Sequence, residues 1–496
     1  MCRWSPEGTS SCSCRLERTQ LVAHVGNRPE GKPFVLIGYG VALAGSVALW
    51  GADATFGVVA GALNVVFAVY FCRHLAFAIA ASRWADGDLH AADVGFDTYT
   101  PAVAVLVGCK NEALVVDGMV AALLELDYPA EQLTLVVVDD GSDDGTGERL
   151  DVWAAREPRL RVLHRPPGSA GGKSGALNDA LALVDGEIVV VFDADHEPEA
   201  TTIRRLVRHF RDPATGAVMG RCVIRNSKDS RMANTVFLDY LSGYLVNEYG
   251  RQAVFELPAY GGANCAVRMS TLRGLGGWNP ETVTEDTDLT LRVLLSGQRV
   301  RYDVTAIDFE EAVISTQRFW KQRYRWARGH QKCMRDYLLP LMRCRHLTLV
   351  ERAETALFLF VYHVPLLSGL GLLLTVLRAF GIGDLPAVAV LPLSMLLFIG
   401  PLAELCVGLL IGRVERRAAW QLLGFLPAFA LSIWITSRAY VDGMLGRPYS
   451  WVKTSRSGSV STARPTPPAS QDRRGDGTGR PRSFAHPGPL VTRGDR

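Results

Sequence analysis

Residues 187–196 read EIVVVFDADH, an apolar run that ends in two aspartates and a histidine. A short and nearly continuous apolar run is typical of a strand that is buried on both faces of a parallel sheet. Similar runs stand at residues 102–107, 133–138 and 160–164, with helical patterns between them at residues 115–125, 148–156 and 174–184. This alternation predicts a doubly wound, Rossmann-like α/β sheet with right-handed crossovers.

Acidic residues follow two of these predicted strands. Residues 139–146 (DDGSDDGT) come after the second strand, and residues 193–196 (DADH) come after the fourth. In such sheets ligands bind outside the carboxyl ends of the strands, and grouped carboxylates there can hold a hard cation such as Mg²⁺ or Mn²⁺. Turn chemistry is the simpler explanation for residues 143–145 alone, because Asp and Gly are common in turns. Two acidic strand ends in one sheet favour a metal or nucleotide site.

A glycine-rich segment follows the third predicted strand. Residues 168–174 (GSAGGKS) resemble a P-loop but miss its pattern by one position, because Pro167 stands where the first glycine belongs. An ATPase is therefore not expected. A glycine-rich turn that carries Lys173 into a helix still suits a diphosphate group.

Apolar runs stand on both sides of this domain. Residues 34–50 and 56–72 precede it, and residues 356–380, 386–412 and 418–436 follow it. Each run is near the ~20 residues that cross a bilayer core. A signal peptide is an alternative for the first run, but its leader is long and a second run follows at once, so a hairpin anchor fits better.

The flanking charges predict the orientation. Arginines and lysines precede the first run and follow the second, which places the middle domain in the cytosol by the positive-inside rule. The sequence thus predicts a multi-pass protein of the plasma membrane. Its expected parts are a polar tail (1–33), a transmembrane hairpin (34–82), the α/β domain (83–335), an interfacial segment (336–352), a membrane region of about three apolar segments (353–445) and a disordered tail (455–496).

The net charge and the cysteine spacing argue against a nucleic-acid-binding protein, a disulfide-rich protein and a zinc protein. The net charge of +3 is small for 496 residues, so nucleic acid is not an expected partner. The ten cysteines form no C-x-x-C pair, and neither a disulfide framework nor a zinc site is expected.

A dense basic and aromatic segment, residues 315–330 (STQRFWKQRYRWARGH), precedes the second group of apolar runs. It could be a nucleic-acid patch, the flank of a membrane helix, or part of an active site at the membrane surface. The low net charge argues against the first of these. The motifs described next favour part of an active site at the membrane surface over a simple flank of a membrane helix.

Together these motifs resemble family 2 glycosyltransferases, which have the GT-A fold. The resemblance covers about residues 100–335 and rests on VLVGCKNE (105–112), VVDDGSDDGT (137–146), GGKSGALN (171–178), VFDADH (191–196), VTEDTDLTLRV (283–293) and QRYRW (322–326). The last matches the QxxRW motif of processive members, the hyaluronan, cellulose and poly-N-acetylglucosamine synthases. The chain departs from the family at Gly108, where proline is frequent, and it lacks the extra spans and regulatory domain of bacterial cellulose synthases.

The resemblance implies an inverting single displacement on a nucleotide-sugar, expected to be a UDP-sugar. It assigns the general base to Asp286, with Glu285 beside it, and a Mg²⁺ or Mn²⁺ ion to Asp193 and Asp195, with His196 as a further ligand. The expected donor or diphosphate residues are Glu112, Asp139, Asp140, Lys173, Asp193, Gln322 and Arg325. The expected acceptor residues are Trp326, Gly262 and Cys265, the last as a small packing residue rather than a nucleophile.

Three functions remain open on the sequence. The leading expectation, supported most by QxxRW and by the apolar runs on both sides, is a processive synthase that elongates a β-linked polysaccharide and exports it. Among polymers, poly-β-1,6-N-acetylglucosamine made from UDP-GlcNAc is favoured ahead of hyaluronan-like and β-glucan products. A non-processive transferase would glycosylate a membrane lipid acceptor. A scaffold with a decayed transferase fold is disfavoured by the intact acidic motifs. The expected partners are the donor, a growing glycan or lipid acceptor, and membrane lipids.

Overall fold

The structure is a computed structural model. It describes residues 33–91, 98–380, 391–414 and 425–447. These residues belong to one compact unit. Residues 1–32 of the predicted N-terminal tail, and all of the predicted tail 455–496, lie outside the described residues.

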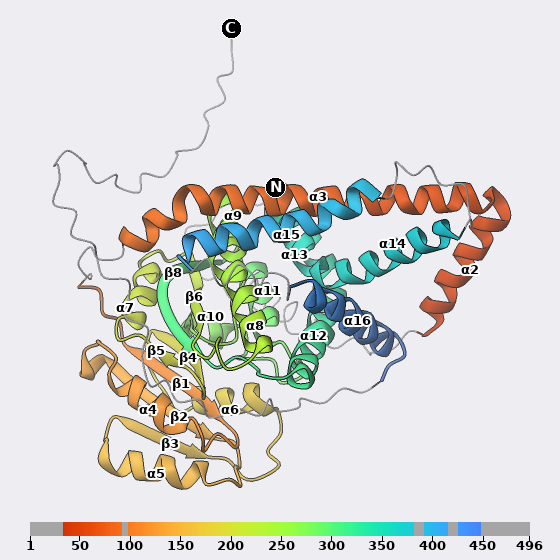
Figure 1. The fold of residues 1–496 in the computed structure, drawn as a ribbon. Helices are drawn as coiled ribbons and strands as arrows, with labels where there is room; N and C mark the ends of the chain where they lie inside the picture. The colour runs from red at the N-terminus through yellow and green to blue at the C-terminus, as the bar shows by residue number, and fades with distance from the viewer. Residues whose placement is uncertain (1–32, 92–97, 381–390, 415–424, 448–496) are drawn as a thin grey trace, which may run out of the picture. The chain divides into compact units, whose positions relative to one another are not determined.

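An eight-stranded mixed sheet forms the core of the α/β domain, at the lower left of Figure 1, in the order β3-β2-β1-β4-β7-β6-β8-β5. The strands are β1 (Val103–Cys109), β2 (Leu133–Asp139), β3 (Leu160–His164), β4 (Ile188–Asp193), β5 (Glu197–Pro198), β6 (Thr215–Ile224), β7 (Cys265–Arg268) and β8 (Arg299–Glu310). The first four in this order pair in parallel, as the sequence predicts. The other half is mixed, because β7 runs antiparallel between β4 and β6 while β6 and β8 are parallel.

Both faces of the parallel half are buried. Val105 of β1 and Val190 of β4 belong to a cluster with α4 (Val116–Leu124), α5 (Thr146–Arg156) and α7 (Thr202–Val207). Leu106 and Val191, one residue further on, belong to a second cluster on the opposite face. The helices of that face are α6 (Gly172–Leu181), α9 (Tyr249–Phe255), α10 (Met269–Gly274) and α11 (Glu285–Leu295). Burial on both faces explains why these strands read as continuous apolar runs.

The basic and aromatic segment forms the first half of one long helix, α12 (Thr316–Met342). Ser315 caps it, since its side chain accepts a hydrogen bond from the backbone N–H of Arg318 at 3.3 Å. Gly329 lets this helix approach Thr284, the residue before α11, because a Cβ at position 329 would lie 2.3 Å from the Thr284 methyl carbon. The QxxRW motif and the Glu285-Asp286 pair are therefore held against each other.

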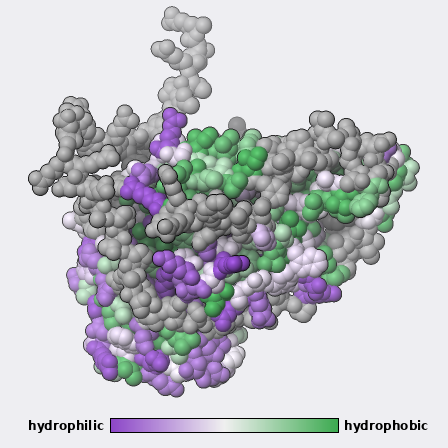
Figure 2. Space-filling view, in the orientation of Figure 1, coloured by the Kyte–Doolittle hydropathy of each residue, from purple (hydrophilic) through white to green (hydrophobic). Residues whose placement is uncertain are grey.

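Apolar helices lie at both ends of the described chain. They are α2 (Pro33–Trp50), α3 (Ala52–Ala91), α13 (Leu349–Phe360), the short η4 (Val361–His363), α14 (Val364–Ala379), α15 (Leu391–Ile411) and α16 (Phe425–Met444). Two stretches among the described residues, Asp53–Leu89 and Leu349–Val376, are long and apolar enough to cross a membrane. Figure 2 shows hydrophobic residues over α2, whereas the surface around α4 and α5 is mainly hydrophilic.

The helix α3 also contributes to the core of the α/β domain. Its residues Phe77, Ala81 and Ala85 are buried in the cluster that covers one face of the sheet. Gly250 of α9 allows this contact, because a Cβ there would lie 2.5 Å from the Cβ of Phe77. Packing in this core therefore accounts for part of the apolar character of α3. The predicted domain limit at residue 82 stays a prediction.

Candidate active site

A cavity of about 710 Å³ opens at the carboxyl ends of the strands. All but two of the residues that the sequence singles out line it. They are Glu112, Asp140, Lys173, Asp193, Asp195, His196, Gly262, Glu285, Asp286, Gln322, Arg325 and Trp326. Their convergence follows from the parallel strands, whose carboxyl ends lie at one edge of the sheet.

Asp139 and Cys265 do not line the cavity. Asp139 accepts a hydrogen bond from the Ser142 backbone N–H at 3.0 Å and lies 3.1 Å from Nδ1 of His164. The buried thiol of Cys265 contacts the carbonyl oxygens of Gly261 and Ala263 at 3.0 Å. Both side chains can therefore act on the cavity only through the loops that they hold.

One end of the cavity is formed by the loops after β1 and β2. The backbone N–H of Glu112 donates to the Thr146 hydroxyl at 2.8 Å, which joins the two loops. Arg165, which follows β3, pairs with Asp140 and donates to Asp179 at 2.7 Å. This arginine fixes the Asp140 carboxylate.

Lys173 lines the cavity and contacts three other residues that line it. Its Nζ is 2.5 Å from Oδ1 of Asp193, 3.4 Å from Oε1 of Glu285, and donates to the Gly262 carbonyl at 2.7 Å. Burial alone would lower the pKa of Lys173, but the charges of Asp193 and Glu285 outweigh it and raise the pKa above its usual value. The side chain is thus a fixed cation at the start of α6, where an anionic group is favoured.

Asp193, Asp195 and His196 offer ligand atoms that all lie within 4.8 Å of one another. Two carboxylate oxygens and an imidazole nitrogen fit a Mn²⁺ ion, and the two carboxylates alone suit Mg²⁺. Nδ1 of His196 pairs with the buried Asp308. Burial alone would lower the pKa of His196, but the carboxylates of Asp308, Asp195 and Glu310 raise it to about 10.

Asp286 lies in the first turn of α11, opposite Lys173. Its Oδ1 accepts a hydrogen bond from the Thr287 backbone N–H at 2.6 Å. Burial and the neighbouring charge of Glu285 raise the pKa of Asp286 to about 6. A carboxylate with a pKa near neutrality is a suitable general base.

The helix α12 lines the next part of the cavity. Arg325 donates to the carbonyl of Val283 at 3.3 Å, two residues before Glu285. The guanidinium of Arg323 lies over the Trp326 ring, 4.2 Å from its centroid. A cation over the indole fixes the ring orientation where Trp326 lines the cavity.

Aromatic side chains line the other end of the cavity. Phe358 and Tyr362 belong to the apolar stretch Leu349–Val376, and both line the cavity. His330 stacks on Tyr362 with ring centroids 4.4 Å apart, and its Nε2 lies 3.2 Å from the Thr287 hydroxyl. Burial and the positive charge of Arg251 lower the pKa of His330 to about 3, so this imidazole is neutral.

Three residues of the cavity or its surroundings were not predicted from the sequence: Glu310, Arg165 and His330. Glu310 lines the cavity at the end of β8, and the rule that identified residues 139–146 would have found it, because DFEE at residues 308–311 is also an acidic strand end. No local pattern indicated Arg165 or His330. Their roles depend on contacts with distant segments.

The sequence is similar to those of known glycosyltransferases. Residues 104–274 match the family model described as Glycosyl transferase family 2. The chain is 36% identical over 240 residues to a β-monoglucosyldiacylglycerol synthase from Synechocystis sp., covering 48% of this chain and 49% of that protein. It is 26% identical over 252 residues to a poly-β-1,6-N-acetyl-D-glucosamine synthase from Staphylococcus epidermidis, covering 50% of this chain and 59% of that protein. The chain thus spans about half the length of these curated relatives.

A solved structure shows the same fold. The mannosyltransferase PcManGT from Pyrobaculum calidifontis, in complex with GDP-Man and Mn²⁺, superposes with a TM-score of 0.52 at 22% identity, over 79% of this chain and 100% of that one. The predicted GT-A fold is thereby confirmed, with a mixed sheet and flanking apolar helices.

Proposed function

We propose that this chain, which carries a glycosyltransferase family 2 domain over residues 104–274, transfers a sugar from a nucleotide-sugar to an acceptor at a membrane surface, with inversion at the anomeric carbon. One observation carries the proposal. A single cavity joins a cationic and acidic centre, around Lys173 and Asp193, to an aromatic end that Phe358 and Tyr362 supply from an apolar helix. A donor and a membrane-bound acceptor can therefore meet inside it.

The donor end provides contacts for each part of a nucleotide-sugar. Glu112 and Asp140 lie at the ends of β1 and β2, where a nucleoside would bind. Lys173 and Arg325 are cations that can contact the diphosphate. Lys173 now bonds to Asp193 and to the Gly262 carbonyl, so diphosphate binding would exchange these partners for phosphate oxygens.

Asp193 and Asp195 would hold a divalent cation, with His196 as the third ligand. When bound, such an ion neutralises charge on the leaving diphosphate. The chain's own contribution on the same side is Lys173, whose charge is fixed beside these carboxylates.

Asp286 would remove the proton of the acceptor hydroxyl as that oxygen attacks the anomeric carbon. Its carboxylate lies close to Gly262, since a Cβ at that glycine would be 3.3 Å from Asp286 Oδ2. The absence of a side chain at Gly262 thus leaves space for an acceptor beside the base. Burial and the neighbouring charge of Glu285 raise the pKa of Asp286, and the Thr287 backbone N–H opposes them in part.

For the acceptor we favour a membrane lipid that receives a defined number of sugars. The aromatic end of the cavity belongs to a helix that is apolar enough to span a bilayer. The Synechocystis sp. relative is named for a glucosyl lipid and has the higher identity of the two curated relatives. Transfer would take place at the cytosolic face of the cell membrane, in a chain anchored by several passes.

A processive polysaccharide synthase is the second candidate. It is supported by Trp326, which completes the QxxRW motif and lines the cavity with its ring held by Arg323. An indole offers a sugar contact area with few directional demands, so a glycan could slip along it by one unit. The Staphylococcus epidermidis relative, which is named for a polymer, supports the same reading.

Product size distinguishes the two. Purified protein in lipid vesicles would be incubated with single UDP-sugars and with GDP-Man, and the products separated into organic and aqueous phases and weighed by mass spectrometry. The lipid proposal expects an organic-phase product of one or two sugars. A ladder of long glycans, shortened by Trp326→Ala at equal protein, would contradict the lipid proposal and support the processive synthase.

A further inference from the structure

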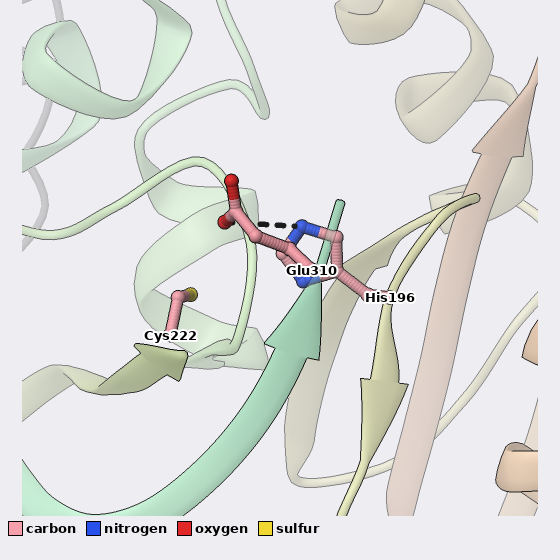
Figure 3. Close-up of side chains that lie close together, drawn as sticks. All are labelled: His196, Cys222 and Glu310. Carbon is pink, nitrogen blue, oxygen red and sulfur yellow. Dashed lines mark ion pairs between the residues drawn. The ribbon is translucent and has the colours of Figure 1, made fainter. Parts of the chain in front are cut away.

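Three metal-ligating side chains that do not form one motif in the sequence meet in the cavity (Figure 3). His196, Cys222 and Glu310 offer ligand atoms that all lie within 4.8 Å of one another. His196 lies between β4 and β5, Cys222 is in β6, and Glu310 ends β8. All three line the cavity, so an ion can reach them from it.

The strand register brings these residues together. β6 and β8 are parallel neighbours in which Cys222 pairs with Asp308 and Ile224 pairs with Glu310. Because side chains alternate along a strand, Asp308 and Glu310 lie on the same face as Cys222. The β5 pairing, with Pro198 opposite Asp308, brings the preceding His196 to this face.

His196 is oriented as metal-binding histidines are. Its Nδ1 pairs with Asp308, which is fully buried, and its Nε2 faces Glu310 at 3.5 Å. A carboxylate that fixes one ring nitrogen and directs the other to an ion is the usual outer partner of a histidine ligand. The contact between His196 and Asp308 favours a metal site separately from the short distances among the three ligand atoms.

The donor set differs from that of the Asp193–Asp195 pair. A thiolate, an imidazole and one carboxylate suit Zn²⁺ and similar ions, whereas Mg²⁺ and Mn²⁺ prefer oxygen ligands. Tetrahedral bonds of about 2.0–2.3 Å separate ligand atoms by roughly 3.5 Å, so modest side-chain movement closes the present cluster on an ion. We propose that His196, Cys222 and Glu310 form a second metal site of this protein, which binds Zn²⁺ with water in the fourth position and releases the protons of the His196 imidazolium and the Cys222 thiol to solvent.

This site could not be predicted from the sequence, because its cysteine belongs to no C-x-x-C pair. The three residues are 26 and 88 positions apart, counting 196 to 222 and 222 to 310. The pairing of β8 with β6 and with β5 joins them.

The site has a consequence for the proposed reaction, and this part rests on the proposed function. His196 belongs to both candidate clusters, with Asp193 and Asp195 on one side and with Cys222 and Glu310 on the other. With Nδ1 held by Asp308, the ring has one nitrogen left for an ion. Zn²⁺ at the second site therefore withdraws His196 from the first, and we expect it to inhibit transfer that Mn²⁺ supports.

Cobalt spectroscopy tests the site without any donor or acceptor. The full chain in detergent is titrated with Co²⁺ alone, with Cys2, Cys12, Cys14 and the exposed Cys72 and Cys406 replaced by serine in every sample. A thiolate-to-cobalt charge-transfer band in the near ultraviolet is expected, and excess Zn²⁺ should remove it. Cys222→Ser should abolish the band, and Glu310→Gln should weaken Co²⁺ binding at least tenfold.

Two controls make the result specific. Cys344→Ser changes a buried cysteine in a separate hydrophobic cluster and should leave the band unchanged. Asp193→Asn alters the other cluster and should also retain it. No band in the parent protein, or a band that survives Cys222→Ser, overturns the proposal and leaves the three residues as a metal-free polar cluster.

A second assay tests the link to catalysis. In the presence of Mn²⁺, Cys222→Ser should raise the Zn²⁺ concentration that halves transfer at least tenfold. Equal inhibition of both proteins would overturn the competition. The cobalt band is measured without turnover, so failure of the proposed reaction would not be mistaken for failure of the site.

Discussion

Asp286 shows how position sets the chemistry of one residue. It stands in the first turn of α11, where its Oδ1 accepts the Thr287 N–H, and burial with the charge of Glu285 raises its pKa to about 6. The hydrogen bond and the nearby Lys173 favour the ionised form but do not outweigh burial. The carboxylate is therefore basic enough to take a proton and still ionised at neutral pH.

Replacement of this carboxylate gives the first prediction. Asp286→Asn keeps the shape but cannot accept a proton, so kcat is expected to fall roughly 10²–10⁴-fold. Donor binding, measured by calorimetry with the corresponding nucleoside diphosphate, should change little. A variant with nearly normal kcat would move the base to another residue, with Glu285 the nearest.

The pH profile gives the second prediction. A base must be ionised to act, and the pKa of Asp286 is raised rather than lowered, so kcat/KM should fall as the pH drops below about 6. The decline should approach roughly tenfold per pH unit. The residual activity of Asp286→Asn should lack this acidic limb. An identical limb in the variant would assign it to another group.

At the scale of elements, the contact of α12 with the start of α11 positions the site. Gly329 approaches Thr284, and three residues before it Trp326 lines the cavity. Arg325 bonds to the Val283 carbonyl on the same segment. The QxxRW motif is thus held against the segment that carries Asp286 by helix packing and by the Arg325 hydrogen bond to Val283.

Gly329→Ala is the third prediction. A Cβ at that position would meet the Thr284 methyl carbon at 2.3 Å, so the helix must shift. Such overpacking costs about 1–3 kcal/mol in unfolding free energy, and we expect kcat to fall while KM for the donor changes little. Thermal unfolding and steady-state kinetics measure both effects.

Gly274→Ala in α10 is the matched control. A Cβ there meets nothing within 4 Å, so stability and kcat should be unchanged or slightly improved. Equal kinetics for the two variants would contradict a positioning role for the α11–α12 contact.

The elements also show what the sequence can and cannot predict. The apolar runs predicted β1 to β4, and the strand-end rule predicted the acidic residues that converge on the cavity. The mixed half of the sheet could not be predicted, because the pairing of β6 with β7 and β8 depends on contacts across long sequence distances. For the same reason His330 and the cluster around Cys222 escaped detection.

At the scale of the whole described unit, a buried ion cluster joins the α/β domain to two apolar helices. Arg73 of α3 pairs with Glu354 of α13 at 2.7 Å, and Arg251 of α9 reaches the same carboxylate at 3.2 Å. All three side chains are buried, so each depends on the others for its charge balance. The cavity and the apolar helices are thereby fixed relative to each other.

The orientation in the membrane is the fourth prediction. Position 53, at the start of α3, should face outward, and position 143, in the loop after β2, should face the cytosol. In a background without native cysteines, Asp53→Cys should react with an impermeant thiol reagent in intact cells and Asp143→Cys should not. Both should react once the cells are opened. The opposite pattern in intact cells would reverse the orientation.

Metal-dependent sugar transfer by the purified protein is the fifth prediction and tests the proposed function most directly. Vesicles with wild-type protein, and others with Asp195→Asn or Asp286→Asn, would be supplied with radiolabelled nucleotide-sugars one at a time. At least one donor is expected to label an acceptor with Mn²⁺ or Mg²⁺. EDTA should stop this transfer, added Mn²⁺ should restore it, and both variants should lose it. Transfer that continues undiminished in EDTA and in both variants, or no transfer from any donor, would rule out the proposed function.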